Sequence, residues 1–430
     1  MKNNFIKSTL ILIIGGFITK VLSMIIKIIM TRNITEEAMS LYMLTLPTYN
    51  LFITLVTSGM QISTSKLVSE NRLNKRKIIS TSLFITLIIS IILVIILVLF
   101  HNSIALLLHN QKLNYPILSI ILSLPFIGIS SIIRGYFLGL NKMHVQVISN
   151  FVEQIIRIIM FLVILPRIDN DILSISFIIG SNLISELASI ITMSLFLPNK
   201  KYIRGKEIIK YDKNIKKEIF SISIPSTTSR IIGTISYFFE PIILTNFLLI
   251  NGYKPDYINY NYGIITGYSM QLLLLPSFFS MAISQSIIPL ISNAFINRKY
   301  KYIKKKINEI ILISFIIGLT YILVIYINPE YFLNLIYNTK KGSNYVRILA
   351  PFFLLLYIQT PLTSILQSIN SSKESMKATI IGVIIKTILM IILSYLRFGM
   401  LAFIIPMITN IVYVTIHNYI SINKKINSFL

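Results

Sequence analysis

The chain has 430 residues, of which 54% are hydrophobic and 13% are charged, and its mean hydropathy is +0.76. A soluble domain carries roughly 25% charged residues, so this composition excludes an ordinary soluble protein. The absence of cysteine excludes disulfides, thiolate metal sites and thiol nucleophiles. The histidines are scattered, without the spacing of metal ligands on a helix, and they are His101, His109, His144 and His417.

The first segment predicts a transmembrane helix that is retained in the protein. Lys2 and Lys7 followed by apolar residues resemble the start of a secretory signal. However, Lys20 follows without a small-residue cleavage site, and apolar residues resume through Met30. Windows of about twenty apolar residues suffice to cross a bilayer. Twelve such windows predict an all-α polytopic membrane protein, and they cover 8–31, 41–64, 78–100, 115–138, 146–166, 172–197, 218–249, 262–291, 307–327, 346–369, 378–396 and 398–421.

The basic residues predict the orientation of these spans. If both termini are cytoplasmic, 26 of the Lys and Arg residues fall on the inner side and 8 on the outer side. Cytoplasmic loops of membrane proteins carry this excess of positive charge. The sequence therefore predicts a multi-pass protein of the plasma membrane with both termini inside. Because the basic runs are short loops, the net charge of +25 does not indicate nucleic acid as a partner.

The charges that remain inside the spans are the candidate site. An excess of cations there indicates a hydrated cavity that accepts an anionic group, since isolated membrane charges are costly. Long side chains that reach the interface are the alternative, which suits Arg134 and in part Lys27. Glu153 and Arg157 are four residues apart and are expected to neutralise each other on one helix. The six cations are Lys20, Lys27, Arg134, Arg157, Arg230 and Lys386, and the three acids, interpreted as counter-ions or coupling groups, are Glu153, Glu186 and Glu240.

Weak similarity between two halves predicts an internal duplication. The halves are an N-terminal six-helix lobe, 1–199, and a C-terminal six-helix lobe, 218–430, joined by a basic cytoplasmic linker, 200–217. An even number of helices per half gives parallel repeats with a cleft between them, a plan found in transporters. The equivalent residues are Lys20 with Arg230, Pro47 with Pro276, Asn141 with Asn370 and Arg157 with Lys386.

No motif indicates catalysis. There is no phosphate-binding glycine loop, Ser/His/Asp set or carboxylate pair, so the sequence predicts neither an enzyme nor a bound cofactor.

Several segments resemble sporulation members of the multidrug/oligosaccharidyl-lipid/polysaccharide (MOP) flippase superfamily. They are "KSTLILIIGGFITKVLSMIIKIIMTRNITEEAMSLYMLTLPTYNLF", "STSKLVSEN", "SSIIRGYFLGLNKMHVQVISNFVEQIIRI" and "QSIIPLISNAF", and the RGYFxGL…EQxxR pattern is the most specific. Arg134 and Arg157 match the family pattern directly. Lys20 and Lys27 stand where the family usually has arginine, which keeps the charge but loses bidentate phosphate binding.

The resemblance implies a MATE-like fold and a flippase that works by alternating access. The implied substrate is an undecaprenyl-diphosphate-linked saccharide, foremost the peptidoglycan precursor lipid II for the spore cortex, bound in a cationic cavity. The implied partners are this lipid, membrane lipids and enzymes of cell-wall synthesis, with a monomer as the expected state. The twelve predicted spans are fewer than lipid II flippases commonly have.

Three other functions stay open at the level of sequence. The chain is alternatively an exporter of another lipid-linked polysaccharide unit, or a MATE-like cation-coupled drug exporter, which needs acids in its cavity. A membrane scaffold for sporulation enzymes is the third, and the duplicated cations argue against it.

Overall fold

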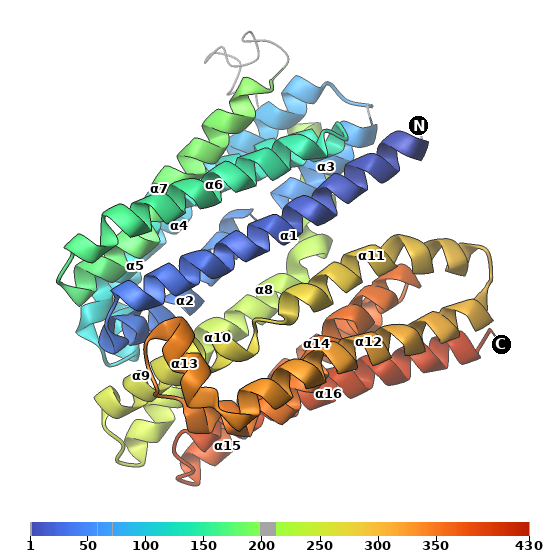
Figure 1. Cartoon of the computed structure of the whole chain (residues 1–430). Helices are drawn as coiled ribbons and strands as arrows, with labels where there is room; N and C mark the ends of the chain where they lie inside the picture. The colour runs from blue at the N-terminus through green and yellow to red at the C-terminus, as the bar shows by residue number, and fades with distance from the viewer. Residues whose placement is uncertain (1, 58, 71, 198–211, 430) are drawn as a thin grey trace. The chain divides into compact units, whose positions relative to one another are not determined.

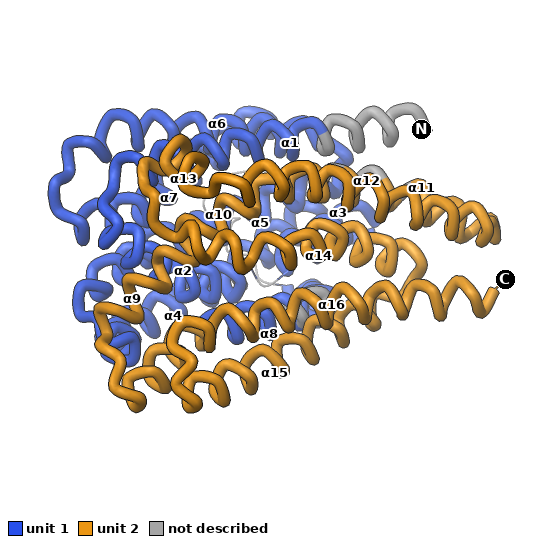
Figure 2. The backbone as a smooth tube through the Cα atoms, turned by 60° about the horizontal axis from the view of Figure 1, so that its bottom comes forward, with its two compact units in different colours: residues 1–238 blue, residues 239–430 orange. Residues whose placement is uncertain are grey.

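The structure is a computed structural model that describes residues 2–57, 59–70, 72–197 and 212–429. These residues form helices joined by short turns, and none of them lies in a β-strand (Figure 1). The chain divides into two compact units, residues 1–238 and 239–430 (Figure 2).

Unit 1 contains α1 (Lys2–Asn33), α2 (Glu36–Thr57), α3 (Met60–Glu70), α4 (Lys75–Leu107), η1 (Gln111–Leu113), α5 (Asn114–Gly139), α6 (Met143–Val163), η2 (Leu165–Arg167) and α7 (Asp171–Leu195). Helix α8 (Lys213–Ile250) begins in unit 1 and ends in unit 2. Unit 2 continues with α9 (Pro255–Ile264), η4 (Ile265–Ser269), α10 (Met270–Leu273), α11 (Ser277–Ile296), α12 (Tyr300–Ile327), α13 (Pro329–Tyr337), α14 (Ser343–Ser368), α15 (Ser372–Tyr395) and α16 (Leu401–Asn427).

The prediction of an all-α polytopic membrane protein is confirmed. Eleven helical segments in the described part of the chain are long and apolar enough to cross a membrane. The remaining predicted span, 262–291, is interrupted by a five-residue π-helix, η4, and by a break before Pro276. Proline lacks the N–H that continues a helix, and π-helical turns are rare in regular helices. The predicted span therefore comprises the end of α9, η4 and α10 and then, after the turn at 274–276, most of α11.

The division between the units falls inside α8, between Phe238 and Phe239. Most of the predicted linker, 200–217, lies outside the described residues. The predicted lobes 1–199 and 218–430 therefore stay a prediction.

The start of α8 is held by a capping aspartate. The Asp212 carboxylate accepts hydrogen bonds from the backbone N–H groups of Asn214 and Ile215 and lies 3.5 Å from Lys77 Nζ. Partial desolvation opposes its ionisation, but these N–H groups and the ammonium outweigh it and hold the pKa of Asp212 below its usual value. The predicted basic stretch before α8 thus ends in a conventional N-cap.

Unit 1 is built around α5, which packs against α2, α3, α4 and α7, while α1 packs against α6. Unit 2 is built around α14, which packs against α11, α12 and α16. Both central helices are apolar around most of their circumference, as a helix surrounded by other helices requires. The central position of α5 carries Arg134 into the middle of unit 1.

Two turns that the predicted duplication pairs have the same backbone conformation. Asn141, between α5 and α6, has φ of 57°, and Asn370, between α14 and α15, has φ of 56°. Asparagine is one of the few residues that tolerate this left-handed region. The match supports the equivalence of α6 and α15, which carry Arg157 and Lys386.

Two glycines of the RGYFLG segment allow α5 to approach α3 closely. A Cβ atom on Gly135 would lie 2.6 Å from the carbonyl oxygen of Gln61, and one on Gly139 would lie 2.6 Å from that of Ser65. Small residues at membrane-helix interfaces permit this kind of backbone contact. The most specific motif of the sequence therefore combines a packing function, in its glycines, with the charge of Arg134.

Gly135→Ala is expected to destabilise the protein by about 1–3 kcal/mol, because the backbone of α3 must move to admit the methyl group. The matched control is Gly180→Ala in α7, where the nearest atom, Leu122 Cδ1, would lie at an ordinary 3.7 Å. Thermal unfolding of the purified variants in detergent compares them. Equal melting temperatures for the two variants would contradict the close approach of α3 and α5.

Candidate functional site

Four charged side chains from three helices meet inside unit 1. Arg134 Nη2 of α5 donates to Glu153 of α6 at 2.8 Å and to Glu186 of α7 at 3.2 Å. Arg157 Nη2, one turn after Glu153 on α6, donates to the other oxygen of that carboxylate at 3.1 Å. Glu153 and Glu186 are only 8% and 6% exposed. Two guanidinium groups thus balance two buried carboxylates, and we call these four residues the unit 1 charge cluster.

Hydroxyl groups complete the surroundings of the unit 1 charge cluster. Ser189 accepts a hydrogen bond from Arg134 at 3.2 Å, and Ser185 accepts one from Arg157 at 3.1 Å. Tyr49 of α2 lies within electrostatic range of Arg157 and of both carboxylates. Within the described residues, the Nε atoms of both arginines are buried and have no hydrogen-bond acceptor. The cluster therefore retains two donors that a further acceptor can use.

Part of this cluster follows from the sequence. The expected pairing of Glu153 with Arg157 is confirmed, because four-residue spacing places both side chains on one face of a helix. The interpretation of Arg134 as a residue that reaches the interface is wrong, since it is half-buried and bonded to two carboxylates. Ser185 and Ser189 were not singled out, although their own four-residue spacing beside Glu186 marks a polar face of α7.

Unit 2 contains a second buried ion pair. The Lys386 ammonium of α15 donates to the Glu240 carboxylate of α8, and the glutamate is 5% exposed. The positive charge of Lys386 is thus neutralised within its own unit. Glu240 occupies the position of a counter-ion, and a role for it or for Glu153 and Glu186 in ion coupling stays a prediction.

Lys386→Met is expected to destabilise the protein by about 3–5 kcal/mol, because it leaves Glu240 buried without a partner. The double variant Lys386→Met/Glu240→Gln removes both charges and is expected to recover most of the loss. Melting temperatures in detergent measure both effects. Lys377→Met is the control, because its pair with Glu374 is exposed and such pairs contribute about 0–1 kcal/mol. A Lys386→Met variant as stable as this control would argue against the buried pair.

Lys20 and Lys27 project from one side of α1, both exposed within the structure, with the two ammonium groups in electrostatic range of each other. At about 100° per residue, this side is roughly 90° from the face that buries Ile26 and Met30. It is roughly 125° from the centre of the exposed apolar stripe that includes Ile18 and Val21. The lysines therefore point neither into the α1–α6 interface nor along the stripe suited to lipid chains.

Arg230 lies on the part of α8 that belongs to unit 1 and is exposed there. Neither Lys20 nor Arg230 forms an ion pair with a described residue of unit 1. The six predicted cations thus fall into two kinds. Arg134, Arg157 and Lys386 are neutralised by buried glutamates, whereas Lys20, Lys27 and Arg230 are exposed.

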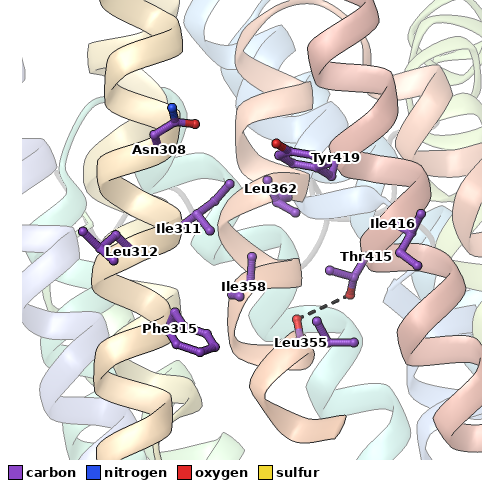
Figure 3. A pocket seen from close by; sticks show the side chains of 10 residues that line it. All are labelled: Asn308, Ile311, Leu312, Phe315, Leu355, Ile358, Leu362, Thr415, Ile416 and Tyr419. Atoms are coloured by element: carbon purple, nitrogen blue, oxygen red, sulfur yellow. Dashed lines mark hydrogen bonds between the residues drawn. The ribbon is translucent and has the colours of Figure 1, made fainter.

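An apolar groove crosses unit 2 between α12, α14 and α16 (Figure 3). Its volume is about 520 Å³, and its polar groups are few, such as Asn308 and the Thr415 hydroxyl, which donates to the Leu355 carbonyl at 3.4 Å. None of the predicted charged residues lines it. The groove is chemically suited to hydrocarbon and is separate from the charged groups described above.

Comparisons with known proteins agree with this architecture. Residues 5–295 match the family model described as polysaccharide biosynthesis protein, and residues 265–396 match the MatE model. The chain is 30% identical to stage V sporulation protein B of Bacillus subtilis over 98% of this chain and 84% of that protein. It is 23% identical to lipid II flippase MurJ of the same organism, over 90% of this chain and 77% of that protein.

The fold is shared with solved transporters. An inward-facing multidrug resistance MATE family transporter of the MOP superfamily superposes with a TM-score of 0.76 at 15% identity, covering 96% of this chain and 95% of that chain. This likeness confirms the predicted MATE-like fold, and the sequence matches confirm the predicted resemblance. The chain belongs to the polysaccharide biosynthesis protein family of the MOP flippase superfamily.

Proposed function

We propose that this protein is a flippase that moves an undecaprenyl-diphosphate-linked saccharide, foremost the peptidoglycan precursor lipid II, across the plasma membrane. Its relatives include a sporulation protein and a lipid II flippase, which supports a role in the spore cortex. The excess of basic residues on one side supports cytoplasmic termini. Enzymes of cell-wall synthesis are the expected neighbours of such a protein.

The observation that carries the proposal is the exposure of Lys20 and Arg230 in membrane-spanning helices without acidic partners in unit 1. Cations survive at such positions by lining a hydrated path, and that path attracts anions. Ammonium and guanidinium groups bind diphosphate oxygens through charge-assisted hydrogen bonds. Lys27, on the same side of α1 as Lys20, extends this cationic strip.

The buried ion pairs take a structural part in the proposal. Arg134, Arg157 and Lys386 are engaged by carboxylates, so we assign them to holding α5, α6 and α7 together and α8 to α15. Translocation then proceeds by alternating access. The substrate selects between inward-open and outward-open states through its different affinity for each.

The test is reconstitution of the purified chain into proteoliposomes with labelled lipid-linked precursor in one leaflet. Time-dependent exposure of the label at the opposite leaflet, above that of protein-free liposomes, is the expected result. The alternative function is MATE-like drug export, which the match of residues 265–396 to the MatE model supports. Drug tolerance of an expressing strain tests this alternative. Raised tolerance together with an absence of precursor translocation would refute the proposal.

A further inference from the structure

A polar cavity lies in unit 2, where the turn between α14 and α15 meets the C-terminal end of α16. Its volume is about 900 Å³, within the range of ligand-binding pockets. We call it the basic pocket, and its lining residues are Asn370, Ser371, Ser372, Lys373, Glu374, Lys377, Ser421, Lys424, Lys425 and Ser428.

The charge of the basic pocket is strongly positive. Four lysines line it, and Glu374 is the only acidic residue of the sequence between 331 and 430. That carboxylate already bonds Lys377 at 3.0 Å. Glu374 also lies within electrostatic range of Lys424, but it supplies one negative charge against four positive ones, so the described lining residues carry a net charge of +3. An anion that enters it meets net positive charge from both α15 and α16.

The other lining groups are suited to the oxygen atoms of a phosphate. The hydroxyls of Ser371 and Ser428 donate to backbone carbonyls of this chain, and that of Ser421 lies 3.4 Å from His417 Nδ1. The Ser372 hydroxyl and the Asn370 amide can donate to an anion without adding negative charge. The left-handed conformation of Asn370 reverses the chain, so that α15 begins at the pocket with Ser372. The unpaired N–H groups of a helix start favour negative charge, which adds to the attraction of the lysines.

The position of the basic pocket identifies the source of the anion. Both α15 and α16 are membrane-spanning segments, and the pocket lies where α15 begins and α16 ends. Lipid phosphates lie at this depth, and basic pockets between transmembrane helices bind anionic headgroups. Lysines on the cytoplasmic side are also expected from the positive-inside rule, because basic loops orient a membrane protein. That rule does not account for a cavity lined by serine side chains around the lysines.

We propose that the basic pocket binds the phosphate headgroup of an anionic glycerophospholipid in the leaflet at which α16 ends. This site shares no residue with the cations assigned to the transported substrate. It therefore goes beyond the proposed flippase function and does not depend on it. Binding there ties the turn between α14 and α15 to the end of α16.

The test compares lipid retention by the full chain and two double variants. Protein is extracted from nanodiscs that contain equal phosphatidylglycerol and phosphatidylcholine, and bound lipids are counted by native mass spectrometry. The pocket variant is Lys373→Gln/Lys424→Gln, because neither lysine side chain forms a hydrogen bond or ion pair with a described residue. The matched control, Lys301→Gln/Lys305→Gln, removes two exposed charges from the start of α12, which lies beside the end of α16 but outside the pocket.

Selective retention of phosphatidylglycerol by the full chain and by the control is expected, with a loss of about tenfold or more in the pocket variant. Equal losses in the two variants would show general surface attraction and overturn the proposal. Displacement of the lipid by inorganic phosphate at equal concentration would also overturn it, because the ligand would then be a free anion. Melting temperatures confirm that both variants are folded, and precursor translocation is measured separately.

Discussion

Alanine at Lys20 or at Arg230 is expected to slow translocation of lipid-linked precursor about 10–100-fold while the protein still inserts and accumulates. Both side chains are exposed in membrane-spanning helices and form no ion pair with a described residue of unit 1, so their removal leaves no buried charge behind. A hydrogen bond to a charged group contributes about 1.5–3 kcal/mol, so one lost contact slows transport about 10–100-fold. Initial rates in proteoliposomes measure the effect.

Two comparisons make this result specific to a cationic headgroup site. Lys20→Arg keeps the charge and adds bidentate geometry, so it is expected to retain transport. Lys142→Ala removes an exposed cation from the turn between α5 and α6 and is expected to transport normally. Wild-type rates in both alanine variants, at equal protein content, would exclude Lys20 and Arg230 from substrate binding.

Arg134→Met is expected to destabilise unit 1 by about 3–5 kcal/mol. The arginine bonds Glu153 and Glu186, and its removal leaves two buried carboxylates with only Arg157 to balance them. Removing one partner of a buried ion pair is costly because an uncompensated charge remains. The melting temperature in detergent and the amount of folded protein in membranes both report this loss.

A compensating change separates charge balance from simple loss of packing. In Arg134→Met/Glu186→Gln the pair of Glu153 with Arg157 remains, so each buried charge again has a partner. This double variant is expected to recover most of the stability, as replacement of buried ion pairs by neutral residues often does. A double variant as unstable as Arg134→Met would mean that the guanidinium acts mainly through packing or through its bond to Ser189.

The sequence predicts one of the buried ion pairs but not the others. Glu153 and Arg157 are neighbours on one helix, so their bond follows from helix geometry alone. The bond between Arg134 and Glu186 joins residues 52 apart, and that between Glu240 and Lys386 joins residues 146 apart. No local sequence pattern relates residues so far apart along the chain. The sequence therefore identifies the membrane cations and acids but does not show which of them pair.

The role of individual membrane cations shows the same limit. Composition and spacing predicted six cations in the spans as one set, but only the packing of α5, α6 and α7 separates the neutralised arginines from Lys20 and Lys27 on α1. The basic pocket likewise joins the start of α15 to the end of α16. In the sequence, each of these segments looks like an ordinary basic end of a membrane-spanning helix.

By itself, the sequence determined that this protein is a helical membrane protein with a strong asymmetry of basic loops and a cationic membrane interior. Hydropathy and charge are properties of each residue, and they add along the chain without knowledge of its fold. Only the tertiary structure decided which cations are buried against glutamates, where the interrupted span breaks, and which lysines surround a cavity. Those features depend on helices distant in sequence meeting at hydrogen-bond distance, and packing alone determines which of them meet.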